Sequence, residues 1–143
     1  MKKNREFLKA HLWGEWEDLQ LDQREGVPNP PYQKPYSAEA ERIDLIPVDE
    51  LSSGQMALAD AIANRKSRRV YNGQPISLEE LSFLLWSTQG IRATVQGGKT
   101  TLRTVPSGGA RHPLETYLFI NNVEGVETGL YRYLAREHQL LPL

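Results

Sequence analysis

The stretch Asn64-Arg65-Lys66-Ser67-Arg68-Arg69-Val70-Tyr71 places four cations and a hydroxyl between an apolar helical pattern and a turn signal. Arginine offers a planar fork of donors that matches phosphate oxygens, lysine adds a point charge, and serine adds a short neutral donor. We therefore predict that Arg65, Lys66, Ser67 and Arg69 hold a phosphate group. Two other interpretations stay open: a solvated basic corner, and a basic tract that addresses nuclei or contacts nucleic acid.

A second segment, Pro106-Ser107-Gly108-Gly109-Ala110-Arg111-His112-Pro113-Leu114-Glu115, is rich in glycine. Backbone amides that lack neighbouring side chains can approach a flat aromatic ring or an anion closely. His112 suggests acid/base chemistry, because histidine titrates near neutral pH. We interpret His112 as a positioning residue, and catalysis is the minority hypothesis.

Together the two segments resemble the nitroreductase family of FMN-dependent oxidoreductases, which has an Arg-x-Ser-x-Arg/Lys phosphate motif followed by a Pro-Ser loop near the flavin. The second segment is similar to the loop of the SagB-type branch, which includes azoline dehydrogenases acting on modified peptides. Ala110 stands where many nitroreductases have asparagine, and this departure also favours that branch. The resemblance extends from residues 4–8 to residues 129–134.

This resemblance implies FMN as the cofactor, with hydride transfer through the flavin. It implies that the basic segment binds the phosphate and ribityl end, and that Pro106, Ser107, Gly108 and Gly109 border the ring. Family members bind the flavin at a homodimer interface, with the two segments contributed by opposite subunits. The implied electron donor is NAD(P)H or another reductant, and the substrate is a small molecule or a modified peptide. The catalytic residues stay unknown, and a metal site is not expected.

The expected fold class is α+β: part of a nitroreductase-like fold, with helices followed by an antiparallel sheet segment. Residues 1–50 are expected to form an N-terminal helix over 4–12 and an extended arm rich in proline and aromatic residues. Residues 51–143 are expected to form the N-terminal part of the FMN-binding domain. The prolines of the arm forbid helix, and its aromatic residues predict that it lies along the domain or a partner subunit.

Local patterns predict the elements of the second part. Capping boxes at residues 52–55 and 77–80 predict helices over about 54–64 and 77–89, the second with Leu81, Leu84 and Leu85 on one stripe. Gly90 is expected to end the second helix in a left-handed conformation. Gly97-Gly98 is interpreted as a flexible loop tip, and no flanking strand is expected. Strands are expected at 116–120, 129–134 and 139–141, the last with an unpaired edge.

Composition limits the classes of function. The length of 143 residues suits one domain plus an arm, and the absence of cysteine excludes disulfides and thiolate chemistry. No long apolar run or signal peptide is recognisable, so we expect a cytoplasmic protein without membrane contact. A pI near 6.3 argues against nucleic-acid binding. The Gly-Gly-Lys-Thr sequence at 97–100 lacks the earlier glycine of a phosphate-binding loop.

Three hypotheses of function follow. The first is an FMN-dependent oxidoreductase that is incomplete as a chain of 143 residues, because family domains run longer; such a chain is expected to bind FMN weakly. The second is a non-catalytic truncated homologue that acts as a dimerisation module or binds a peptide or nucleotide. The third is a nucleic-acid-binding module that uses the basic cluster. Flavin absorbance and retention on nucleic acid separate the three.

Overall fold

The computed structural model describes residues 20, 22, 24–28, 30–98 and 100–143. The chain divides into two compact units, residues 1–31 and 32–143. In the first unit, the amide of Val27 donates a hydrogen bond to the carbonyl of Asp22. The helix expected over residues 4–12 lies outside the described residues. Within the described part, no helix has the length and apolar character needed to cross a membrane.

The helix α3 (Leu78–Gln89) begins where the sequence predicts. The Ser77 hydroxyl accepts a hydrogen bond from the amide of Glu80, and the Glu80 carboxylate accepts one from the amide of Ser77, so the capping box is complete. The expectation of a left-handed Gly90 is wrong, because this residue has φ −59° and ψ 140°. Glycine is needed there for space: a Cβ atom at position 90 would lie 2.2 Å from Cδ1 of Trp86.

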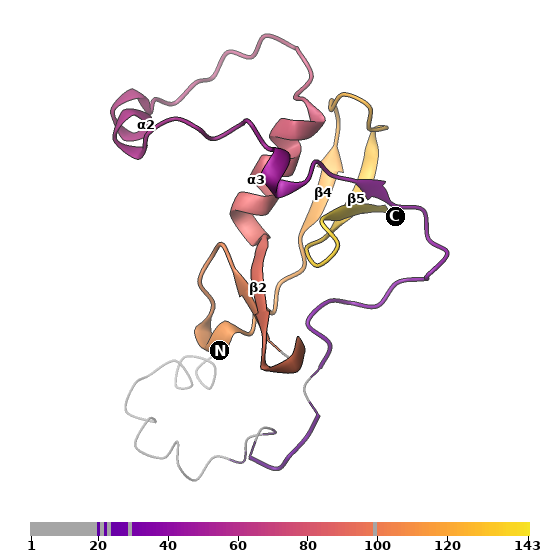
Figure 1. Ribbon diagram of the computed structural model, residues 1–143. Helices are drawn as coiled ribbons and strands as arrows, with labels where there is room; N and C mark the ends of the chain where they lie inside the picture. Colours follow the sequence, from indigo (N-terminus) through magenta and orange to yellow (C-terminus); the bar gives the residue numbers. More distant parts are fainter. Residues whose placement is uncertain (1–19, 21, 23, 29, 99) are drawn as a thin grey trace, which may run out of the picture. The chain divides into compact units, whose positions relative to one another are not determined.

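A four-stranded antiparallel sheet packs beside α3 (Figure 1). Its strands are β1 (Ile43–Asp44), β4 (Tyr117–Ile120), β5 (Gly129–Leu134) and β6 (Gln139–Pro142), in the spatial order β1-β6-β5-β4. The three later strands form the predicted meander. With two α-helices and antiparallel sheets, the unit has an α+β fold.

The prediction that the last strand has an unpaired edge is wrong. β6 pairs with β5 on one side and with β1 on the other, where Ile43 opposes Leu140 and Asp44 opposes Gln139. The amide of Leu45 also donates to the carbonyl of His138. Residues from the expected arm therefore complete the sheet, which the local sequence pattern of β6 does not reveal.

The hydrophobic core lies between α3 and one face of this sheet. Leu81 and Leu85 of α3 are buried in it, whereas Leu84 is exposed. The predicted apolar stripe therefore packs mainly within the unit. The other buried members of the core are Leu45, Ile120, Tyr131, Tyr133, Ala135 and Leu140.

A second hairpin follows α3, where the sequence indicated only a loop tip. It comprises β2 (Ile91–Val95), the 3-10 turn η3 (Gln96–Gly98) and β3 (Thr100–Arg103). Gly97 and Gly98 turn the chain with positive φ values of 65° and 92°. The two glycines thus form a loop tip as predicted, whereas the expectation of no flanking strand is wrong. The sequence does not reveal β2 because four of its five residues are exposed, so this strand lacks the alternating apolar pattern.

The helix α2 (Leu58–Asn64) starts later than predicted, and no side chain caps it at Ala57. The expected capping box is absent, because Ser52 and Ser53 use their amides and hydroxyls to bind the Glu79 carboxylate at 2.7–3.1 Å. A short 3-10 turn, η2 (Val48–Glu50), precedes these serines. None of the α2 residues is buried.

Candidate functional site

The basic segment, residues 65–69, leaves the end of α2 without regular secondary structure (Figure 1). The amide of Arg65 still donates to the carbonyl of Ile62, and its backbone is extended at φ −62° and ψ 122°. All five side chains of the segment are exposed. In the part of the chain that the structure describes, none of them forms an ion pair or a side-chain hydrogen bond, so their donors are available to an anion.

Large apolar side chains precede and follow the basic segment in the sequence and are also exposed. Val70 is 91% exposed and Tyr71 is 86% exposed, and Leu58 and Ile62 of α2 are 75% and 69% exposed. Isolated apolar side chains on a surface are normal, but a concentration of them beside a charged segment is typical of an interaction site.

The second predicted segment forms a tight, strained loop around η4 (Gly108–Ala110). The Ser107 hydroxyl accepts a hydrogen bond from the amide of His112 at 2.9 Å, and the Ser107 carbonyl accepts one from the amide of Ala110 at 3.0 Å. Gly109, Ala110 and His112 all have positive φ values, between 43° and 61°. Such conformations cost of order 1–3 kcal/mol for residues other than glycine, and they cluster at functional sites.

The residues assigned to the flavin ring differ in exposure. Pro106, Gly108 and Gly109 are exposed. Ser107 is half-buried, and its hydroxyl accepts a hydrogen bond from the amide of His112 inside the loop. A Cβ atom added to Gly108 would meet nothing within 4 Å, so this stretch of backbone faces open space. The loop can therefore receive a flat ligand against its main chain.

His112 is buried at the base of this loop. Burial lowers the pKa of its imidazole, and the charge of Arg103 lowers the pKa further. A neutral imidazole at neutral pH suits the interpretation of His112 as a positioning residue better than a role as a charged acid.

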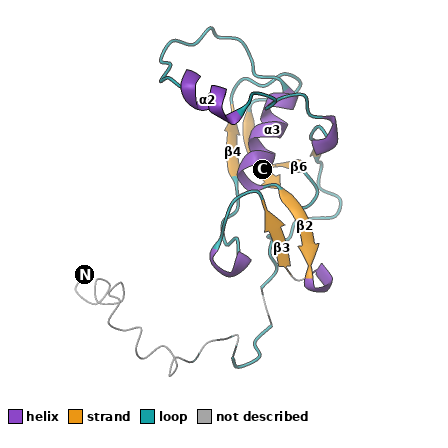
Figure 2. Cartoon of the chain, turned by 60° about the vertical axis from the view of Figure 1, so that its left-hand side comes forward, coloured by secondary structure: helices purple, strands orange, loops and turns teal. Residues whose placement is uncertain are grey.

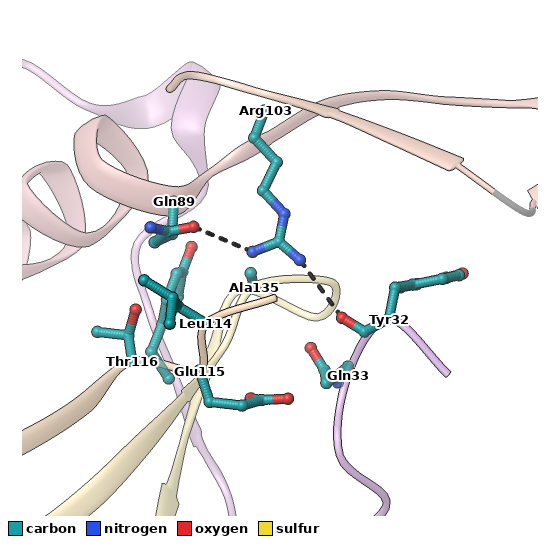
Figure 3. A pocket seen from close by; sticks show the side chains of 9 residues that line it. Tyr32, Gln33, Gln89, Arg103, Leu114, Glu115, Thr116 and Ala135 are labelled. Carbon is teal, nitrogen blue, oxygen red and sulfur yellow. Dashed lines mark hydrogen bonds between the residues drawn. The ribbon is translucent and has the colours of Figure 1, made fainter. Parts of the chain in front are cut away.

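Arg103 of β3 is a residue that sequence analysis missed, and it joins three parts of the unit (Figure 3). Its NH1 group donates to Gln89 at 3.1 Å and its NH2 group to the carbonyl of Tyr32 at 3.5 Å. Burial lowers the pKa of the guanidinium, and the nearby Glu115 carboxylate opposes that shift. A lone arginine in a short polar strand carries no motif, so only the fold reveals this role.

The cavity beside Arg103 is small. Its lining includes Tyr32, Gln89, Glu115 and Tyr133, and its volume of about 10 Å³ has room for roughly one water molecule. It is therefore too small for an isoalloxazine ring.

The two predicted segments are not brought together within one chain. Figures 1 and 2 show the basic segment after α2 well away from the loop of residues 106–113, which lies beside the β2–β3 hairpin. A single ligand cannot contact both segments in this arrangement unless a second chain supplies one of them.

Comparison with known proteins gives a consistent result. A model described as the nitroreductase family matches residues 62–142, a range that includes both segments. The chain is 38% identical over 87 residues to "Putative nitroreductase MJ1384" from Methanocaldococcus jannaschii, which covers 61% of this chain and 41% of that protein. It is 46% identical over 69 residues to "Trifolitoxin-processing protein TfxB" from Rhizobium leguminosarum bv. trifolii, covering 46% of this chain and 18% of that protein. The chain thus spans less than half the length of either relative.

Proposed function

Because this chain belongs to the nitroreductase family, we propose that it is an FMN-dependent oxidoreductase of the SagB-type branch that works as a homodimer. The observation that carries the proposal is the basic segment. Its cationic side chains are exposed and have no partner among the described residues, and it stands near the start of the range that matches the family.

The phosphate of FMN is assigned to Arg65, Lys66, Ser67 and Arg69. In an extended backbone, residues two apart point to the same side, so Arg65, Ser67 and Arg69 can converge on one dianion. Their exposure means that little rearrangement is needed before the ligand binds. The donor set of guanidinium, ammonium and hydroxyl groups fits a phosphate in charge and geometry.

The ring of the flavin is assigned to Pro106, Ser107, Gly108 and Gly109. The strain at Ala110 and His112 supports this assignment, since it fixes the path of the loop before any ligand arrives. The open space at Gly108 leaves room for the ring edge.

The separation of the two segments supports a homodimer. One protomer would supply the basic segment and its partner the glycine-rich loop, and the exposed apolar side chains of α2 would become buried between them. A symmetric pair of such contacts creates two equivalent sites.

When bound, the flavin accepts and returns a hydride, and the protein residues bind and orient it. The electron donor is NAD(P)H or another reductant. The substrate is a small molecule or a modified peptide, and the similarity to a trifolitoxin-processing protein supports the peptide. We propose this activity for the protein that carries the basic segment and the glycine-rich loop.

The test is a fluorescence titration of the chain with FMN and, in parallel, with riboflavin, which lacks the phosphate. Arg65→Ala and Arg69→Ala should each weaken FMN binding roughly tenfold to a hundredfold, because removing one charged partner costs about 1.5–3 kcal/mol. Riboflavin binding should change little. Arg68→Ala is the matched control, since it removes the same charge from a residue not assigned to the phosphate.

Equal losses in all three variants would indicate a general field of positive charge and contradict the assignment. A chain that binds neither FMN nor riboflavin would contradict flavin binding and favour the non-catalytic alternative.

A further inference from the structure

Residues 32–36, which we call the strap, contact β3, β5 and the segment before β4, largely through their main chain. The carbonyl of Tyr32 accepts from Arg103, and the carbonyls of Lys34 and Pro35 accept from NH2 of Arg132 at 3.2 and 3.5 Å. The amide of Lys34 donates to the Glu115 carboxylate at 2.6 Å. Main-chain atoms occur in every peptide, so these contacts do not depend on the identity of the strap side chains.

Side chains hold the two ends of the strap. The guanidinium of Arg136 lies over the ring of Tyr32 at 5.6 Å, and Gln33 donates to Glu137 at 2.8 Å. At the other end, the guanidinium groups of Arg132 and Arg42 lie 5.7 and 5.8 Å from the ring centre of Tyr36. These side chains thus add cation–π contacts and one hydrogen bond to the main-chain contacts of the strap.

Arg132 is incompletely satisfied by the strap. The residue is only 5% exposed, and its Nε atom is buried without a hydrogen-bond partner. Among the described residues, no carboxylate forms an ion pair with Arg132. A buried positive charge is costly unless an opposite charge or a full set of acceptors compensates it. The two strap carbonyls and one ring face supply only part of that compensation.

We propose that the strap is an internal ligand in a peptide-binding groove, and that the groove takes a segment of another protein in which proline is followed by an acidic residue. The main chain of that segment takes the place of the strap on Arg103, Glu115 and Arg132. The proposal uses none of the residues assigned to the flavin, so it stands or falls separately from the oxidoreductase function.

The acidic residue is placed where Tyr36 lies in the strap. A carboxylate at that position would lie between Arg42 and Arg132, neither of which has a carboxylate partner in the described part of the chain. Charge-assisted hydrogen bonds from guanidinium to carboxylate are shorter and stronger than those to neutral carbonyls. The preceding proline favours the extended backbone that presents successive carbonyls to the sheet.

The test uses the full chain and three fluorescent peptides measured by anisotropy. The first has the sequence of residues 30–36, PPYQKPY, the second ends in glutamate in place of the last tyrosine, and the third ends in glutamine. The tethered strap competes at an effective concentration on the order of millimolar, so the unmodified chain should bind all three weakly. Tyr36→Ala removes the aromatic end of the strap and should open the groove. Arg136→Ala, a change at an exposed residue, should open it from the other end.

In both opened variants the glutamate peptide should bind roughly tenfold more tightly than the glutamine peptide, and the difference should fall as salt is raised. Adding Arg42→Ala, another exposed position, should reduce that preference severalfold without affecting the fold. Adding Arg132→Lys should reduce it further. Equal binding of the glutamate and glutamine peptides would overturn the proposal, as would no binding to either opened variant. Preferential binding of PPYQKPY would overturn it in favour of strap exchange between two copies of this chain.

Discussion

The hydroxyl of Tyr133 lies 2.8 Å from Nδ1 of His138, and the other ring nitrogen of His138 lies 3.0 Å from the carbonyl of Ile46. A carbonyl only accepts hydrogen bonds, so Nε2 of His138 carries the proton and Nδ1 accepts from Tyr133. Burial raises the pKa of the Tyr133 hydroxyl far above its ordinary value, which keeps this donor protonated. Burial also lowers the pKa of His138, which favours the neutral imidazole that can accept from Tyr133.

Stability should decrease on mild acidification. Burial lowers the pKa of His138, partly opposed by its bond to the Ile46 carbonyl, and burial also lowers the pKa of His112. Below about pH 6.5 the unfolded chain takes up these protons before the folded chain does. The stability contributed by the neutral forms is thus fully present above that pH and is lost as the pH falls through the folded pKa values. Urea unfolding between pH 8 and pH 5 measures it.

The variant His138→Asn is the control for this pH dependence. Asparagine tolerates the positive φ of 55° at this position and does not titrate. Its stability should vary less with pH between 8 and 5 than that of the unmodified chain. An identical slope in both proteins would show that His138 does not contribute.

Gly90→Ala should destabilise the junction between α3 and β2. The new methyl group would lie 2.2 Å from Cδ1 and 2.5 Å from the carbonyl oxygen of Trp86, and the backbone atom cannot easily move. We expect a loss of about 1–3 kcal/mol in the free energy of unfolding, as is usual for overpacking. Gly108→Ala is the matched control, because its methyl group meets open space and its change should stay within about 0.5 kcal/mol.

The Glu79 carboxylate should hold the segment before α2 in place. It accepts four hydrogen bonds from Ser52 and Ser53, of which that from the Ser52 hydroxyl does most to lower its pKa. Glu79→Gln should accelerate hydrogen exchange at the amides of Ser52 and Ser53 while leaving α3 protected. The exposed residue Glu50 supplies the control Glu50→Gln, and equal acceleration in that variant would contradict the specific role.

The homodimer should dissociate when charge is placed on the exposed face of α2. Ile62→Glu introduces an unpaired charge among side chains that the proposal buries between protomers. Sedimentation should show a concentration-dependent dimer for the unmodified chain and a monomer for the variant. Leu102→Glu, on the separate β2–β3 hairpin, serves as the control. A folded monomer of the unmodified chain at high concentration would rule the dimer out.

Elements with local signals could be predicted from the sequence, and elements defined by distant partners could not. The Ser77–Glu80 box and the strands β4 to β6 have signals in neighbouring residues, and the structure confirms these elements. The serines at 52 and 53 form an equally good local motif, but Glu79 binds them instead. The pairing of β1 with β6 joins two residues of β1 to a strand far along the chain, and no local sequence pattern predicts this pairing.

The candidate site shows the same division. The basic segment and the glycine-rich loop are visible as motifs, and their assignment to FMN stays a prediction. Arg103 and Arg132 carry no motif, because each acts through carbonyls that only the fold brings near. The separation of the two motifs in space also depends on α3, which lies between α2 and the β2–β3 hairpin (Figure 2).

The position of β6 between β5 and β1 has a consequence for folding kinetics. The meander of β4, β5 and β6 closes through short loops, whereas Asp44 and Gln139 meet across 95 positions of sequence. Closing so long a loop costs more entropy, and contacts of this separation form late. Hydrogen exchange should therefore find β1 and the strap exchanging through openings that leave the meander closed. The contacts that form last are thus the first to be lost. The strap would expose Arg132 to solvent many times before the domain itself unfolds.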